Sequence, residues 1–249
     1  LGVHVIPMSF NFGEESYTHY PDEREYTAKD FFDRLRNGDM STTNQINQAE
    51  FTDVFESYLQ NGVDVLYIGF SSALSGTYHN SVMVAEELGL PVVKVQHHYA
   101  HILSCMAEND CAEQVIGVSF DGTGYGTDGT IWGGEILLSD LDGFTRVGSV
   151  MPFLQVGGDA SSKEGWRIAV SLIYGMTGDR KKAAEITEKL ELCTKQEANV
   201  QFTMADRKIN AVISTSAGRL FDGVSAMLGI RRKSTFEGEA SMALEFAAE

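Results

Sequence analysis

One stretch of the sequence, residues 96–135, constrains the fold more than any other. It begins Gln-His-His-Tyr-Ala-His, so three of the six histidines of the chain fall within five residues. After a run with helical spacing come an apolar segment of strand length and a glycine-rich segment, Asp-Gly-Thr-Gly-Tyr-Gly-Thr-Asp-Gly. Histidines beside glycines, which let backbone N–H groups approach an anion, favour metal and nucleotide chemistry.

His97 and His101 have the spacing of two metal ligands on one helix face. Residues four apart lie on the same side of a helix, so both imidazoles can reach one cation, whereas His98 points elsewhere. Two histidines at this spacing are also common as surface or packing residues. The spacing alone therefore leaves both interpretations open.

The glycine-rich segment predicts a hairpin with an anion site at its turn. Residues 115–120 alternate small and apolar side chains as a strand does, and residues 131–138 have the pattern of the returning strand. We expect the turn between them to cradle a phosphate with its backbone N–H groups. Its residues are Asp121, Gly122, Gly124, Gly126 and Gly129. The alternative is an ordinary hairpin turn, which Asp-Gly and Gly-Thr pairs also make.

The first part of the chain alternates predicted strands and helices, which favours a parallel sheet. We expect an opening strand at 2–10, helices at 28–35 and 50–60, and a buried strand at 63–70. Two segments rich in hydroxyl and amide groups, 41–47 and 71–78, could together hold a small anion such as a carboxylate. Helix capping explains each segment separately and is the alternative.

Composition excludes several classes of function. The formal net charge of −16 argues against a nucleic-acid partner and against an anionic membrane surface. No run approaches the roughly 20 apolar residues of a membrane span. The three cysteines have neither zinc-ribbon nor redox spacing, which favours a reduced, cytoplasmic setting.

Four motifs in the second part of the chain resemble the C-terminal domain of the HypF carbamoyltransferases. They are Val-Gln-His-His-Tyr-Ala-His-Ile at 95–102, Phe-Asp-Gly-Thr-Gly-Tyr-Gly-Thr-Asp-Gly-Thr-Ile-Trp-Gly-Gly-Glu at 120–135, Gly-Gly-Asp-Ala at 157–160, and Thr-Ser-Ala-Gly-Arg-Leu-Phe-Asp at 215–222. The likeness runs from about Glu87 to the end. It implies an actin-like (ASKHA) ATPase-type α/β domain, which we place at residues 89–249.

The resemblance also implies an activity and its site. In NiFe-hydrogenase maturation, this domain passes a carbamoyl group from carbamoyl-adenylate to the C-terminal cysteine of a HypE-like partner protein. His97 and His101 would hold a divalent metal, zinc or iron, and Asp222 would hold the nucleotide ribose. Without the resemblance, Asp222 has the pattern of a solvated helix carboxylate. The residues expected to bind ATP or carbamoyl-adenylate are Asp121, Gly122, Thr123, Gly124, Gly126, Gly157, Gly158, Asp159 and Asp222.

Two parts of that machinery are expected elsewhere. The family's third protein ligand to the metal, an aspartate in a later loop, would lie beyond Glu249, and the domain that makes carbamoyl-adenylate is absent from the sequence. We therefore expect weak metal affinity and no complete reaction by this chain alone.

The first part of the chain resembles a different family, the DegV fatty-acid-binding proteins. The motifs are Val-Ile-Pro-Met-Ser-Phe at 5–10, Thr-Thr-Asn-Gln-Ile-Asn at 42–47 and Ser-Ser-Ala-Leu-Ser-Gly-Thr-Tyr at 71–78. The resemblance implies a parallel-sheet fragment at 1–88 that holds the carboxylate of a long-chain fatty acid. Thr43, Asn44, Ser71 and Ser72 would lie at the head group, with Asn44 where the family usually has Ser.

The chain is therefore expected to be a fusion of two fragments, joined near residues 85–91. Three outcomes stay open at this point: a carbamoyltransferase-type domain, a fatty-acid-binding protein, or two fragments that do not fold stably because open sheet edges favour aggregation.

Overall fold

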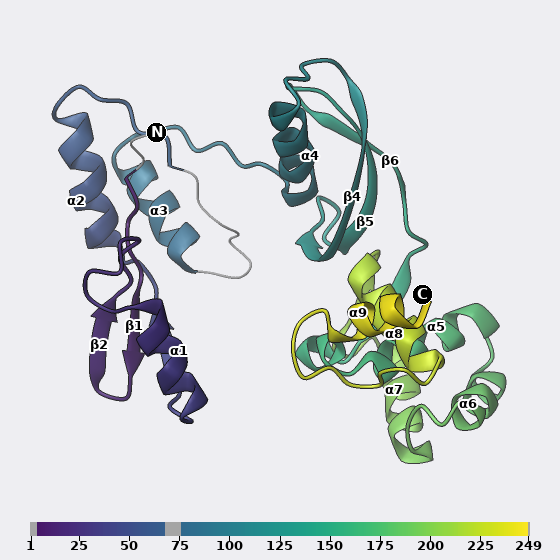
Figure 1. The fold of residues 1–249 in the computed structure, drawn as a ribbon. Coiled ribbons are helices and arrows are strands. Elements are labelled where there is room, and N and C mark those ends of the chain that lie inside the picture. Colours follow the sequence, from purple (N-terminus) through teal and green to yellow (C-terminus); the bar gives the residue numbers. More distant parts are fainter. Residues whose placement is uncertain (1–3, 68–75, 249) are drawn as a thin grey trace. The chain divides into compact units, whose positions relative to one another are not determined.

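The computed structural model describes residues 4–67 and 76–248 (Figure 1). The chain divides into two compact units, Leu1–Lys94 and Val95–Glu249. Each unit combines helices with a sheet. The predicted boundary at 88/89 lies close to this division and stays a prediction.

The first unit holds a three-stranded antiparallel sheet of order β2-β1-β3 and three helices among its described residues. Strands β1 and β2 are joined by two residues, Gly13 at φ +60° and Glu14, so the chain reverses at once and the pair must be antiparallel. The elements are β1 (Ser9–Phe12), β2 (Glu15–Thr18), α1 (Ala28–Arg36), β3 (Ser41–Asn44), α2 (Gln48–Leu59) and α3 (Gly76–Glu87).

This antiparallel sheet differs from the parallel sheet that the alternation of strands and helices predicts. Residues 63–67 of the expected buried strand form no strand, and residues 68–75 lie outside the described part of the chain. The helices expected at 28–35 and 50–60 are confirmed as α1 and α2. Helix α1 has no buried residue, whereas Phe51 and Phe55 of α2 are buried in a small apolar core with Ile46.

The second unit is built on a mixed sheet of order β4-β5-β8-β7, with β6 paired to β5. Only the β5–β8 contact is parallel among the pairs described; the others are antiparallel. The elements are α4 (His97–Glu108), β4 (Val115–Tyr125), β5 (Ile131–Ser139), β6 (Phe144–Ser149), β7 (Phe153–Val156), the 3-10 helix η1 (Gly158–Ser162), α5 (Gly165–Thr177), α6 (Arg180–Lys189), α7 (Lys195–Arg207), β8 (Ala211–Ser214), α8 (Ala217–Met227) and α9 (Glu239–Ala248).

Helix α5 forms the core against which α6, α7 and α8 pack. Trp166, Ala169, Val170 and Ile173 recur at helical spacing, are buried, and contact Phe202 of α7. The helix ends where Gly178 adopts a left-handed conformation at φ +59°. None of the helices in residues 4–67 and 76–248 combines the length and apolar character needed to cross a membrane.

Backbone segments of the second unit approach each other very closely at Gly133 of β5. A Cβ atom added there would lie 2.6 Å from the Asp121 carbonyl oxygen and 2.8 Å from the Ser216 Cα atom. Because both neighbours are backbone, neither can turn aside as a side chain would. Glycine at this position therefore allows β4, β5 and the start of α8 to meet.

We predict that Gly133→Ala destabilises the protein by about 1–3 kcal/mol, the usual cost of overpacking a dense site. Gly143→Ala is the matched control, because a Cβ atom at Gly143 meets nothing within 4 Å. The free energy of unfolding in urea measures both effects. Equal stability of the two variants would contradict the close backbone contact.

Candidate metal and nucleotide site

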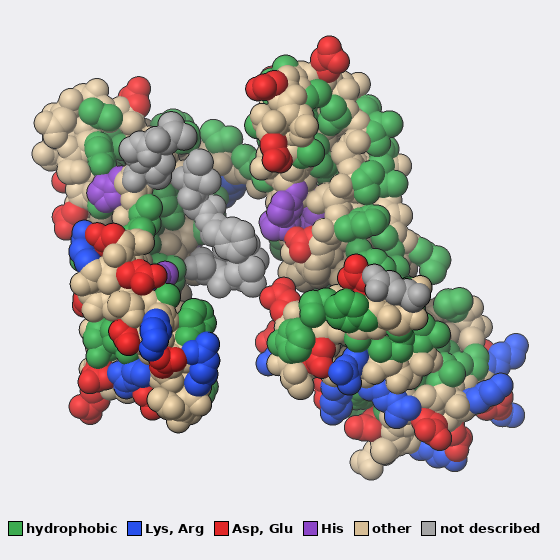
Figure 2. Space-filling model, viewed as in Figure 1, with side chains coloured by type: hydrophobic (Ala, Val, Ile, Leu, Met, Phe, Trp, Pro, Cys, Tyr) green, Lys and Arg blue, Asp and Glu red, His purple; other side chains and the backbone are tan. Residues whose placement is uncertain are grey.

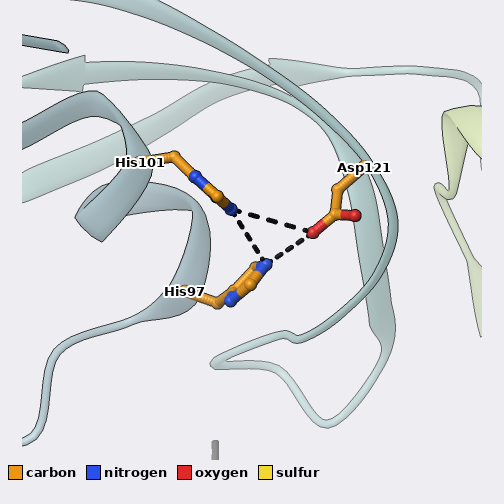
Figure 3. A group of neighbouring side chains, drawn as sticks. All are labelled: His97, His101 and Asp121. Atoms are coloured by element: carbon orange, nitrogen blue, oxygen red, sulfur yellow. Dashed lines mark hydrogen bonds and ion pairs between the residues drawn. The ribbon is translucent and has the colours of Figure 1, made fainter. Parts of the chain in front are cut away.

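Three side chains of the second unit point toward one another: His97 and His101 from α4, and Asp121 from β4 (Figure 3). The His97 Nε2 atom lies 2.5 Å from an Asp121 carboxylate oxygen and 3.2 Å from the His101 Nε2 atom. The His101 Nε2 atom lies 4.0 Å from the same oxygen. All three ligand atoms therefore lie within 4.8 Å of one another.

This spacing fits one small divalent cation. In a tetrahedral zinc site with bonds of about 2.0–2.1 Å, the ligand atoms lie roughly 3.3 Å apart. The three distances in this cluster, 2.5, 3.2 and 4.0 Å, lie on both sides of that value. The side chains of His97 and His101 are 27% and 59% exposed, so an ion has access from solvent. Figure 2 shows histidines at the surface beside an acidic side chain near α4.

Helix α4 presents the two histidines because its opposite face is buried. Tyr99, Ile102 and Met106 pack into an apolar cluster, which leaves the His97 and His101 face turned outward. The helix begins after Gln96, whose side chain accepts a hydrogen bond from the Tyr99 N–H at 2.9 Å.

His98 lies on the inner side of α4, as its position in the sequence predicts. It is fully buried, and its Nε2 atom has no hydrogen-bond partner in the part of the chain that the structure describes. Burial, together with the neighbouring His97, lowers the pKa of His98 to about 4. It is therefore neutral at neutral pH.

The predicted hairpin is confirmed, but its turn is shorter than the expected one, which began at Asp121 and extended to Gly129. Strand β4 continues to Tyr125, and the chain turns at residues 126–130. Of the four glycines expected in the turn, only Gly129 has a positive φ, +77°. Gly124 is needed for a different reason: a Cβ atom there would lie 2.3 Å from the His98 ring.

The N–H groups expected to cradle a phosphate are partly engaged. The Gly122 N–H donates to the Asp121 carboxylate at 2.6 Å, and the Gly126 N–H donates to the Thr130 carbonyl at 2.9 Å. The side chain of Thr123 is exposed on β4. A phosphate role for these residues stays a prediction.

Asp121 is suited to bind a cation because it stays ionised. Burial by itself would raise its pKa, but hydrogen bonds from His97 and from the Gly122 N–H outweigh burial and hold the pKa below its ordinary value. From the sequence, Asp121 was expected at a phosphate. In the structure it joins the histidines, which sequence spacing could not indicate, because Asp121 lies twenty positions after His101.

Gly122 connects this cluster to α8. Its carbonyl oxygen accepts a hydrogen bond from the Ser216 hydroxyl at 2.7 Å, and Ser216 also caps α8 by accepting from the Arg219 N–H. A Cβ atom added at Gly218 would lie 3.0 Å from the Gly122 Cα atom. The helix N-terminus therefore lies against the strand that carries Asp121.

Asp222 is not the solvated helix carboxylate of the alternative interpretation, because it is only 5% exposed. Its Oδ2 atom lies 2.8 Å from the Nε atom of Arg219, one turn earlier on α8. Burial raises the pKa of Asp222 above its ordinary value even though Arg219 acts in the opposite direction.

The Gly157-Gly158-Asp159 segment opens η1 and reaches the same neighbourhood through Arg219. Both glycines have positive φ angles, +118° and +53°, and Asp159 is exposed. The carbonyl oxygen of Ser162, at the end of η1, accepts from Arg219 at 3.3 Å. Arg219 thus links η1 to Asp222, a role that no pattern in the sequence indicates.

The expected carboxylate site of the first unit is described only in part. Thr43 and Asn44 lie on β3, and the Asn44 side chain bonds with Asn11 and Ser9. Ser71 and Ser72 lie outside the described residues. Asn47 makes a capping box with Glu50 at the start of α2, so capping accounts for the end of the 41–47 segment.

A family model described as "Carbamoyltransferase, Kae1-like Domain, second subdomain" matches residues 117–249. The chain therefore belongs to this carbamoyltransferase family. A model of the DegV family matches residues 1–108, in agreement with the two resemblances stated from the sequence. The predicted likeness to HypF proteins and to DegV proteins is confirmed.

Individual relatives agree with the family models. The probable carbamoyltransferase HypF of Methanocaldococcus jannaschii is 38% identical over 170 residues, 67% of this chain and 22% of the relative. A solved structure of full-length HypF in its phosphate- and nucleotide-bound form is 40% identical, with a TM-score of 0.60 over 69% of this chain and 22% of that chain. A DegV domain-containing protein of Clostridium perfringens is 47% identical over 88 residues, 35% of this chain and 30% of the relative. This chain thus spans about a fifth of the length of these two HypF proteins.

We predict that His101→Ala weakens Zn²⁺ binding at least tenfold, because one of three converging ligands is lost. Isothermal titration with Zn²⁺ at neutral pH measures the effect. His79→Ala is the control, since His79 is exposed and lies outside the cluster. Unchanged affinity in His101→Ala would contradict a metal site on α4.

Proposed function

We propose that the second unit forms the metal- and nucleotide-binding part of a HypF-type carbamoyltransferase. The observation that carries the proposal is the convergence of His97, His101 and Asp121 beside Gly122, in a chain that belongs to a carbamoyltransferase family. The nucleotide-bound HypF relative supports ATP or carbamoyl-adenylate as the ligand.

His97, His101 and Asp121 would hold the metal, for which zinc and iron both suit a site of two imidazoles and a carboxylate. When bound, the cation would supply Lewis-acid stabilisation of negative charge on phosphate. Asp121 contributes a negative charge to the site, and His98, neutral and buried on the inner side of α4, adds none.

The nucleotide would lie along Gly122 and the start of α8. The first N–H groups of a helix have no partners within the helix, and they favour an anion. Ser216 already accepts from the N–H of Arg219, which leaves those of Ala217 and Gly218 as candidate phosphate donors. Asp222 would accept hydrogen bonds from the ribose hydroxyl groups, with Arg219 fixing its orientation.

The acceptor of the carbamoyl group would be a cysteine of a partner protein that acts in hydrogenase maturation. The partner's thiolate would attack the carbamoyl carbon; a C–S bond forms, the bond from that carbon to the phosphate oxygen breaks, and AMP leaves with the electron pair. Burial raises the pKa of Cys193 to about 11, so this cysteine stays protonated and is a poor nucleophile.

We predict that the chain binds ATP more tightly than 2′,3′-dideoxy-ATP in the presence of Zn²⁺, by about tenfold, the effect of one or two hydrogen bonds to a charged group. Asp222→Asn should reduce this preference, because the amide accepts less strongly. Isothermal titration with the two nucleotides measures the ratio. Asp206→Asn is the control, since Asp206 pairs with Arg180 on a different surface. Equal affinity of the unsubstituted chain for both nucleotides would exclude ribose recognition by Asp222.

The second candidate function is fatty-acid binding by the first unit, supported by the match to the DegV family. Thr43 and Ser72 would donate hydroxyl hydrogen bonds to a lipid carboxylate, with Asn44 and Ser71 beside them.

For this candidate we predict that the double variant Thr43→Ala/Ser72→Ala loses palmitate binding, measured by displacement of a fluorescent fatty acid. Thr42→Ala is the control, because Thr42 precedes Thr43 on β3 and successive side chains of a strand point to opposite faces. Palmitate affinity that survives the double variant would rule out this head-group site.

A further inference from the structure

Glu135 of β5 is a fully buried carboxylate with partners for both of its oxygens. One oxygen accepts from the N–H groups of Gly133 and Gly134 at 3.2 and 3.3 Å and from the Thr215 hydroxyl at 2.5 Å. The other accepts from the Arg146 Nε atom at 2.6 Å. An unpaired buried carboxylate is strongly unfavourable, so this set of partners is needed to keep Glu135 inside the protein.

The N–H groups that Glu135 accepts from lie opposite an irregularity in β4. Phe120 pairs with Gly134 and Gly124 pairs with Trp132, so residues 121–123 of β4 lie opposite Gly133 alone. Such bulges bend a strand and change the direction of a side chain. Here the bulge begins at Asp121, whose carboxylate faces the two histidines of α4 (Figure 3).

The Glu135 carboxylate also reaches the opposite side of the bulge. Thr215, which donates to Glu135, precedes Ser216, and Ser216 donates to the Gly122 carbonyl at 2.7 Å. Residues 121 and 122 are therefore held between β5 and the start of α8. Glu135 bonds on both sides of them: to Gly133 and Gly134 within β5, and to Thr215 just before α8.

Arg146 of β6 balances the charge of Glu135 and fixes its orientation. Its guanidinium also contacts Asp128 at 3.1 Å and Thr215 at 3.3 Å, and it lies over the Trp132 ring at 4.3 Å. Asp128 in turn accepts from the Trp132 ring N–H at 3.0 Å. The Glu135 carboxylate thus has a fixed position relative to the hairpin.

We propose that Glu135 is a positioning residue: by holding Gly133, Gly134 and Thr215, it maintains the bulge that directs Asp121 toward His97 and His101. Glu135 does not touch the cation. The inference rests on the proposed metal site and adds to it the group that orders one ligand.

Cobalt provides the test, because its visible absorption reports ligand number and geometry. Glu135→Gln keeps the size and one acceptor oxygen but removes the charge opposite Arg146, and Thr215→Val removes the link to α8. Partners behind metal ligands typically change affinity by 10–100-fold. We expect each variant to bind Co²⁺ at least tenfold more weakly, with altered visible absorption. Gln201→Met is the control, since Gln201 is a buried amide of the same unit that bonds to Val156 and Arg167.

A double-mutant comparison separates positioning from general destabilisation. In an Asp121→Ala background, Glu135→Gln should have little further effect on Co²⁺ affinity, because the ligand that it orders is already gone. The same fold-loss with and without Asp121 would overturn the inference, as would unchanged affinity and absorption in Glu135→Gln and Thr215→Val. If the unsubstituted chain binds no Co²⁺, the proposed metal site itself fails, and the inference fails with it.

Discussion

The second unit depends on a junction where β4, β5 and the start of α8 touch through their backbones. Gly133 and Gly218 permit the contact, because a Cβ atom at either position would meet backbone atoms within 3.0 Å. The junction fixes the direction of Asp121 toward α4. It also places the N-terminus of α8, and with it Arg219, next to Gly122, and Arg219 in turn pairs with Asp222. The residues proposed for the metal and for the nucleotide therefore come from one tightly packed region.

The first unit has a different architecture and a different proposed function, fatty-acid binding. Its sheet is antiparallel and small, and its apolar core is formed mainly by α2 and its neighbours. The resemblance to DegV proteins extends over the motifs of this unit, and the family model supports it. Thr43 and Asn44 are the described residues of the proposed carboxylate site.

Local signals predicted much of this fold. The helix with His97 and His101, the hairpin of residues 115–138, and helices α1 and α2 follow from periodicity and from capping residues such as Asn47. The place of Asp121 could not be predicted in this way, because it depends on a bulge whose register is set by contacts with β5 and α8. Gly124, which was expected in a turn, is instead needed for close packing against His98. The antiparallel pairing of β1 and β3 is likewise long-range and left no local pattern.

X-ray absorption of the zinc-loaded chain tests the central claim most directly, since it reports the atoms bound to the metal. The account predicts nitrogen and oxygen neighbours at about 2.0–2.2 Å, with the scattering of two imidazole rings, and the loss of one ring in His97→Ala. Sulfur neighbours at about 2.3 Å, or a spectrum that His97→Ala leaves unchanged, would contradict a site formed by His97, His101 and Asp121.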